Sequence, residues 1–183
     1  YANRKGLGVI VMEPLLGGRL ARPPAAVQAI WERSGRDWPA AEWALQWLWH
    51  KPEVSVVLSG MSAIDQVQAN LLAANRSGVG ALNAADLATV AAARDQYNEL
   101  CPVPCTRCEY CMPCPNGVNI PENFSIFNEG VMFDAMPDVR RRYLHVDEGA
   151  RASACVQCRV CEDKCPQSIL ISLACAEMMA HYG

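Results

Sequence analysis

The cysteines of this chain are crowded into one part of it. All ten lie between Cys101 and Cys175, and the first hundred residues contain none. Eight of the ten form two runs of four, and each run ends in a Cys-Pro pair. Because of this division, the average composition of the 183 residues describes neither half of the chain.

The spacing within the two runs is that of iron–sulfur ligands. The first cysteine run reads C-T-R-C-E-Y-C-M-P-C-P, and the second reads C-V-Q-C-R-V-C-E-D-K-C-P. Three thiolates spaced by two residues let one loop wrap a cubane, and in two-cluster ferredoxins the fourth cysteine ligates the other cluster. The first run has two residues, not three, before its last cysteine. We predict one [4Fe–4S] cluster on Cys105, Cys108, Cys111 and Cys165, and a second on Cys155, Cys158, Cys161 and Cys114.

Two other roles for these cysteines, zinc binding and disulfide formation, fit the sequence less well than cluster binding. Structural zinc usually takes two separated pairs of cysteines, which two complete runs with trailing prolines fit poorly. Disulfides between cysteines three residues apart would be strained and need an oxidising compartment. We expect Cys101 and Cys175 to be small buried side chains, and the histidines His50, His145 and His181 show no ligand-like grouping.

The composition excludes several classes of protein. The chain is 51% hydrophobic and 19% charged, which argues against wholesale disorder. No apolar run approaches the ~20 residues of a membrane helix. A net charge of −3 argues against binding nucleic acid through bulk charge. With no secretory signal in view we expect a cytoplasmic protein, and Arg140, Arg141 and Arg142 form either a solvated helix face or a docking patch for an acidic redox partner.

The two halves carry different secondary-structure patterns. In residues 1–100, short apolar strands at 9–12 and 54–58 alternate with helices at 25–33, 39–51, 63–75 and 84–99, a pattern of parallel β/α units. We expect Asn83 to cap the last of these helices with Asp86, and Ser62 to cap the third with Asp65. Residues 101–183 form an α-helical domain that begins at a Cys-Pro-Val-Pro segment.

Three helices are expected in this second domain, at 119–134, 137–144 and 168–180. The spacing of apolar residues predicts their buried faces. The first helix should bury Ile120, Phe124, Phe127 and Val131, and the third should bury Ile169, Leu170 and Leu173.

Several stretches of the first half resemble the aldo/keto reductase family. Residues 8–20 (G-V-I-V-M-E-P-L-L-G-G-R-L) resemble that family's seventh strand and the loop after it. Residues 43–47 (W-A-L-Q-W) and 54–62 (V-S-V-V-L-S-G-M-S), followed by Gln66 and Asn70, resemble its last helix–strand–helix stretch. The whole chain is similar to the C-terminal part of the aldo/keto reductases that carry a ferredoxin-type tail.

This resemblance implies the C-terminal portion of a (β/α)8 barrel followed by an α-helical two-cluster ferredoxin-like domain. It implies an oxidoreductase that uses NADP or NAD. Positions 61–63 contain no basic residue that could bind the 2′-phosphate of NADP, so nothing there favours NADP over NAD. The family's catalytic residues would lie upstream of Tyr1, so we assign none here and expect the missing barrel portion as a partner of this piece. The small carbonyl substrate stays unidentified. By the resemblance, the nucleotide contacts are Leu15, Gly17, Leu20, Gly60, Ser62, Gln66 and Asn70.

Two rival functions stay open at this point. In the first, the protein is a carbonyl reductase whose clusters are structural or redox-sensing. In the second, the chain is a zinc-binding interaction module without a redox role.

Overall fold

The computed structural model describes residues 1–182 of the chain. They fold into two compact units, and the division between them falls after Gln96, within one long helix. Both units are largely helical, and the strands of the described residues form a single pair.

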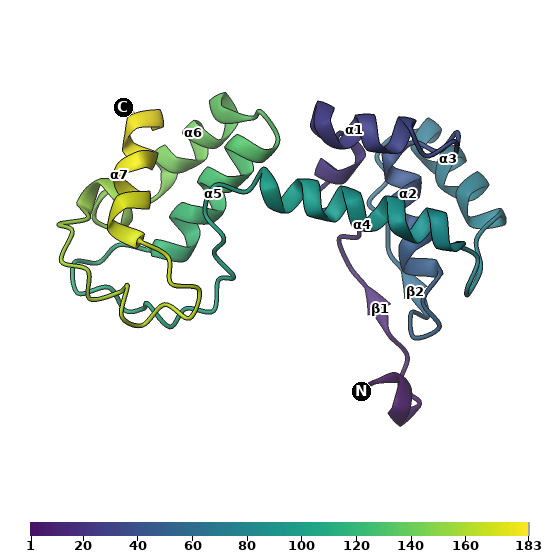
Figure 1. Cartoon of the computed structure of the whole chain (residues 1–183), viewed down its shortest axis with the longest axis horizontal. Coiled ribbons are helices and arrows are strands. Elements are labelled where there is room, and N and C mark those ends of the chain that lie inside the picture. The colour runs from purple at the N-terminus through teal and green to yellow at the C-terminus, as the bar shows by residue number, and fades with distance from the viewer. Residues whose placement is uncertain (183) are drawn as a thin grey trace. The chain divides into compact units, whose positions relative to one another are not determined.

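The first unit is built around that strand pair. β1 and β2 are parallel, with Ile10 opposite Val56 and Val11 opposite Val57, and two helices lie between them along the chain (Figure 1). Parallel strands need such a crossover connection. The elements of this unit are η1 (Asn3–Lys5), β1 (Ile10–Val11), η2 (Arg19–Ala21), α1 (Ala25–Glu32), α2 (Ala40–Trp49), β2 (Val56–Val57), α3 (Ile64–Asn75) and most of α4 (Ala84–Glu99).

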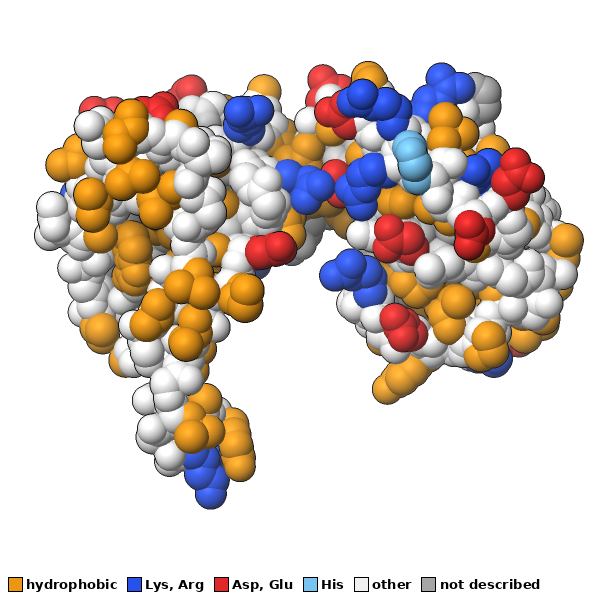
Figure 2. Space-filling view, turned by 180° about the vertical axis from the view of Figure 1, so that it is seen from behind, with side chains coloured by type: hydrophobic (Ala, Val, Ile, Leu, Met, Phe, Trp, Pro, Cys, Tyr) orange, Lys and Arg blue, Asp and Glu red, His pale blue; other side chains and the backbone are white. Residues whose placement is uncertain are grey.

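The two strands are shorter than their apolar runs predicted. Each pairs with one neighbour only among residues 1–182, and the register covers two residue pairs, with flanking hydrogen bonds from the Ser55 N–H to the Val9 carbonyl and from the Leu58 N–H to the Val11 carbonyl. Ile10 is 61% exposed, and Met12, Val56 and Leu58 are also exposed. Figure 2 shows hydrophobic side chains, coloured orange, on the surface of the molecule. The strand pair therefore leaves apolar side chains in contact with solvent.

Tryptophans on α1 and α2 form the core of the first unit. Trp43 is 1% exposed and stacks on Trp31, with ring centroids 5.0 Å apart. The ring of Trp38 meets Trp43 edge-on at 4.9 Å. Trp47, one turn further along α2, is 39% exposed and lies under Lys51. Only one of the two tryptophans of the W-A-L-Q-W segment is thus a core residue.

The cap predicted for α4 is confirmed. The Asp86 N–H donates to Asn83 Oδ1 at 2.9 Å, and the Asn83 N–H donates to Asp86 Oδ2 at 3.0 Å. Arg36 adds a two-point ion pair to the same carboxylate. Asp86 therefore joins the start of α4 to the segment that follows α1.

The cap predicted for α3 is wrong. The helix begins one residue later than Ser62 requires, with Ala63 as its N-cap and no side chain in the capping position. The Ser62 N–H instead donates to Gln66 Oε1 at 2.9 Å. Asp65 Oδ1 accepts a hydrogen bond from the Gln66 N–H, so its carboxylate is used locally.

The second unit packs three helices over two cysteine-bearing loops (Figure 1). In α5, Asn119 caps the first turn by accepting from the Glu122 N–H, and Ile120, Phe124 and Phe127 are buried as predicted. Val131 is 37% exposed, which corrects the fourth member of that face. The elements here are α5 (Ile120–Met132), α6 (Met136–His145), η3 (Glu148–Ala150), η4 (Ala152–Ala154) and α7 (Ile171–Tyr182).

The buried face predicted for α7 is wrong in part. Leu170 precedes the helix, and Leu173 is 61% exposed. Ile171, Cys175 and Met178 are buried instead, because the helix starts three residues later than predicted and its inner face is therefore set by Ile171. None of the helices within residues 1–182 combines the length and the apolar character needed to cross a membrane.

Candidate metal centre

Two cavities in the second unit collect the cysteines of the two runs. They contain about 320 Å³ and about 310 Å³ of space free of protein atoms, part of it open to solvent. The first cavity is lined by Cys105, Cys108, Cys111 and Cys165, and the second by Cys114, Cys155, Cys158, Cys161 and Cys175. Each cavity thus receives three cysteines from one run and one cysteine from the other, the grouping on which the predicted ligand sets depend.

The backbone of the two runs follows the same path. The residues on either side of Cys108, Arg107 and Glu109, have φ values of 53° and 64°. Those on either side of Cys158, Gln157 and Arg159, have φ values of 57° and 64°. Left-handed backbone at non-glycine residues is uncommon and persists where the surroundings require it. Each loop therefore turns sharply on both sides of its second cysteine.

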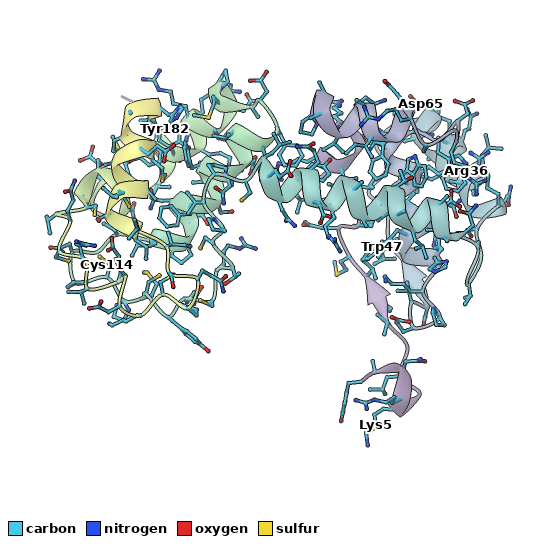
Figure 3. The ribbon with its side chains drawn as sticks, in the orientation of Figure 1. Lys5, Arg36, Trp47, Asp65, Cys114 and Tyr182 are labelled. Carbon is cyan, nitrogen blue, oxygen red and sulfur yellow. The ribbon has the colours of Figure 1, made fainter. Side chains whose placement is uncertain are left out.

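Burial repeats between the runs as well. The third cysteine of each run is buried, the second is exposed and the other two are half-buried. Figure 3 labels Cys114 within these loops. The exposed members are Cys108 and Cys158, so one side of each cavity lies close to solvent.

The repeat continues into the helices that follow the runs. α5 begins at Ile120 and α7 at Ile171, in each case the sixth residue after the fourth cysteine. Both isoleucines are buried, and each lines both cavities. They therefore form a shared apolar wall between the two groups of sulfurs. Sequence reasoning missed this continuation, although the equal spacing from each Cys-Pro pair was visible.

A hydrogen-bonded carboxylate ties the second run to α7. Glu162 Oε1 accepts from the N–H and the hydroxyl of Ser172, and Oε2 accepts from Arg159 Nε at 2.9 Å. These bonds lower the pKa of Glu162 to about 2, and the hydrogen bond from the Ser172 hydroxyl makes the largest contribution. The carboxylate therefore stays ionised at the start of the helix, where negative charge is favoured.

The electrostatics of the thiols reflect their grouping. Burial raises the pKa of the Cys111 thiol, and the sulfur of Cys165 from the other run adds to the effect. Burial raises the pKa of the Cys161 thiol to about 11, with a further contribution from Cys114. Binding metal requires thiolates, so loading these cavities must release protons.

The donor set fits an iron–sulfur cluster better than a single ion. Thiolates are the ligands of Fe–S clusters, and one run of cysteines supplies them from around a loop. Here four sulfurs of the predicted sets line the wall of each cavity. Within residues 1–182, no group of three His, Cys, Asp or Glu side chains is close enough to hold one metal ion.

The cysteines outside the runs differ from each other. Cys175 is buried, as expected, but it also lines the second cavity beside Cys155. Burial and the neighbouring sulfur of Cys155 raise the pKa of Cys175 to about 12. Cys101 is half-buried, lies outside both sets of lining residues and contacts the Val103 carbonyl through its sulfur. Sequence reasoning missed the position of Cys175 at a cavity.

The residues assigned to a nucleotide by resemblance lie in the two segments that follow the strands. Leu15, Gly17 and Leu20 come after β1. Gly60 and Ser62 come after β2, while Gln66 and Asn70 belong to α3. The Asn70 amide donates to Ser59 Oγ at 3.0 Å, and Gln66 holds the Ser62 backbone. Since the strands are parallel, both segments start from the same edge of the sheet.

Two of the three consecutive arginines of α6, Arg141 and Arg142, form ion pairs with carboxylates. Arg141 pairs with Asp138, and Arg142 pairs with Glu129 at 2.5 Å. Arg141 and Asp138 are both largely exposed. Pairing of this kind on an exposed helix favours the solvated-face interpretation of these arginines over a docking patch.

Comparison with known proteins bears on the cysteine-rich part of the chain. Residues 104–170 match the model of the family described as "4Fe-4S dicluster domain". Searches of curated proteins and of solved structures find no significant match to the chain. The match covers both cysteine runs and the segment between them, and it indicates a redox role. Residues 104–170 of this chain are therefore a 4Fe–4S dicluster domain.

Proposed function

We propose that this chain binds two [4Fe–4S] clusters and carries electrons to or from a partner protein. The observation that supports this most strongly is that each cavity is lined by three cysteines of one run and one of the other. When bound, each cluster takes up and releases one electron. The protein supplies the thiolates, and Ile120 and Ile171 keep the space between the cavities apolar.

Metal and sulfide analysis of the anaerobically purified chain tests this proposal. We expect about eight iron and eight acid-labile sulfide per chain, a brown colour and bleaching by dithionite. Zinc with negligible sulfide would instead support the interaction module and contradict the proposal. The matched control is Cys101→Ala, which removes a cysteine outside both cavities and should leave the iron content unchanged.

We further propose that the first unit is the C-terminal portion of an aldo/keto reductase-type barrel, and that the complete protein is an NAD(P)-linked oxidoreductase. The parallel pairing of β1 with β2 across two helices supports this, as do the segments that follow both strands from one edge. In (β/α)8 barrels, phosphate-binding sites form in the loops after strands seven and eight. The exposed apolar side chains of the strand pair are consistent with a sheet that continues.

A charge-matched pair of variants tests the nucleotide site. A Cβ at Gly60 meets no atom within 4 Å, so Gly60→Glu and Gly60→Gln both fit the loop. The carboxylate should repel the phosphates of NADP or NAD, whereas the amide of similar size should not. Titration with each dinucleotide should show weaker binding for Gly60→Glu alone. Equal affinity of the two variants would contradict the proposed site and leave the cluster proposal intact.

The same proposal predicts that the clusters exchange electrons with the nucleotide in the complete protein. Hydride transfer moves two electrons, and two clusters accept one each. Anaerobic addition of NADPH or NADH to the complete protein, followed by visible absorption, measures this exchange. Clusters that dithionite bleaches and that neither dinucleotide reduces would favour the alternative, a carbonyl reductase whose clusters are structural or redox-sensing.

A further inference from the structure

The two cavities are built from equivalent positions, but four of these positions carry different chemistry. The equivalence follows the repeat described above, which relates Cys105 to Cys155 and Ile120 to Ile171. The pairs that differ, first cavity then second, are Thr106 and Val156, Glu109 and Arg159, Pro121 and Ser172, and Phe124 and Cys175, while Gln167 and Asn116 both carry a side-chain amide.

The first cavity has a mostly apolar and acidic lining. Its polar donors are the Thr106 hydroxyl and the Gln167 amide, and within residues 1–182 neither side chain hydrogen-bonds to a cysteine sulfur. Phe124 is fully buried and offers no hydrogen-bond donor. Pro121 has no N–H to donate. Glu109 brings a carboxylate to the same wall. None of these three groups can stabilise negative charge that gathers on the sulfurs of Cys105, Cys108, Cys111 and Cys165.

The second cavity has two side-chain donors that reach its sulfurs. The Asn116 amide donates to Cys158 Sγ at 3.7 Å. The Cys175 thiol, in the position of Phe124, lines the same cavity as Cys155 and is placed to donate to its sulfur. Arg159 is paired with Glu162, so its charge is largely offset. The difference between the cavities therefore rests mainly on the two donors, Asn116 and Cys175.

We propose that Asn116 and Cys175 give the cluster of the second cavity a higher reduction potential than that of the first, so that electrons collect at the second. The proposal rests on the binding of a cluster in each cavity. Reduction adds one negative charge to a cluster, and hydrogen bonds to its sulfurs favour the reduced form and raise the potential. One electron then leaves the first cavity and enters the second, with no further reactant.

A potentiometric titration of the holoprotein with dithionite, followed by electron paramagnetic resonance, tests the proposal. We expect two separate reduction steps. Asn116→Leu and Cys175→Ala should each lower the potential of the higher step and leave the lower step in place. Cys175→Ser keeps a donor and should retain the higher step. The control Asn98→Leu makes the same change as Asn116→Leu on the surface of α4, outside both cavities, and should shift neither step.

Replacing the fourth predicted ligand of each cluster shows which reduction step belongs to which cavity. Cys114→Ala should abolish the higher step, and Cys165→Ala should abolish the lower one. Since Asn116 is exposed, its replacement tests the proposal even if Cys175→Ala fails to fold. A single two-electron step in the unaltered protein, or an Asn116→Leu variant with an unchanged higher step, would overturn the proposal. A protein without iron and sulfide would refute the proposed function instead, so the two failures are distinguishable.

Discussion

Cys165 lies at the wall of the same cavity as Cys111, although the two residues belong to different cysteine runs. Cys114 stands in the same relation to Cys161 in the other cavity. Neither run closes its own cavity, so the two loops depend on each other for a complete set of four sulfurs. The dicluster domain is therefore expected to assemble as a unit and not one loop at a time.

Replacing either of two tryptophans one turn apart on α2 should change the stability of the first unit by very different amounts. Trp43→Ala removes a fully buried ring between Trp31 and Trp38 and should lower the free energy of unfolding of the first unit by about 3–5 kcal/mol. Trp47→Ala, the matched control, removes a side chain that is 39% exposed and should cost much less. Urea unfolding followed by circular dichroism measures both. Equal losses would contradict the core described for this unit.

The carboxylate of Asp86 predicts a pH dependence. Hydrogen bonds from Arg36, together with that from the Asn83 N–H, hold the pKa of Asp86 below its ordinary value of about 3.9. The stability that this ionised group contributes is fully present above that value, and is lost as pH falls through the lower pKa of the folded state.

Unfolding experiments at several pH values test this contribution. Tryptophan fluorescence reports on the first unit, since all five tryptophans precede residue 50. Asp86→Asn should be less stable than the unaltered chain at neutral pH, and the difference should shrink in acid. The control Asp95→Asn removes an exposed carboxylate and should change neither the stability nor its pH dependence appreciably. A constant deficit for Asp86→Asn at every pH would contradict the assignment.

The contact between α5 and α6 leaves no room for a side chain at Gly130. A Cβ there would come within 2.5 Å of both Met136 Sδ and Val139 Cγ2. Val139 is fully buried, so Gly130→Ala should force the helices apart and cost about 1–3 kcal/mol. Gly149→Ala is the control, since a Cβ at Gly149 meets no atom within 4 Å. Thermal unfolding compares the two; unchanged melting of Gly130→Ala would contradict this packing.

Much of the secondary structure was predictable, because local signals coincide with it. Both ends of α4 agree with prediction, and so does the Asn83–Asp86 cap, since these two residues lie three positions apart at the start of the helix. The inner face of α7 was not predictable in the same way. Apolar residues occur around that helix, and its starting residue, Ile171, is set by the loop that follows the second cysteine run.

The candidate site was partly readable as well. The cysteine spacing alone predicts the ligand sets, because thiolates two residues apart suit a cluster. The donors near the second cavity carry no such spacing signal. Asn116, just after the first run, and Cys175, on α7, both lie at sulfurs of the second run, Cys158 and Cys155, so only the fold brings them together. The left-handed backbone at Arg107 and Arg159 likewise has no signature in residue type.

Iron analysis of paired cysteine variants tests the central claim most directly. If each cluster takes its fourth ligand from the other run, Cys111→Ala and Cys165→Ala damage the same cluster, and combining them should cost no more iron than either alone. Combining Cys111→Ala with Cys114→Ala damages both clusters and should remove nearly all the iron. The reverse result, with the Cys111 and Cys114 pair losing no more iron than one variant and the Cys111 and Cys165 pair losing nearly all of it, would contradict the exchange of ligands between the runs.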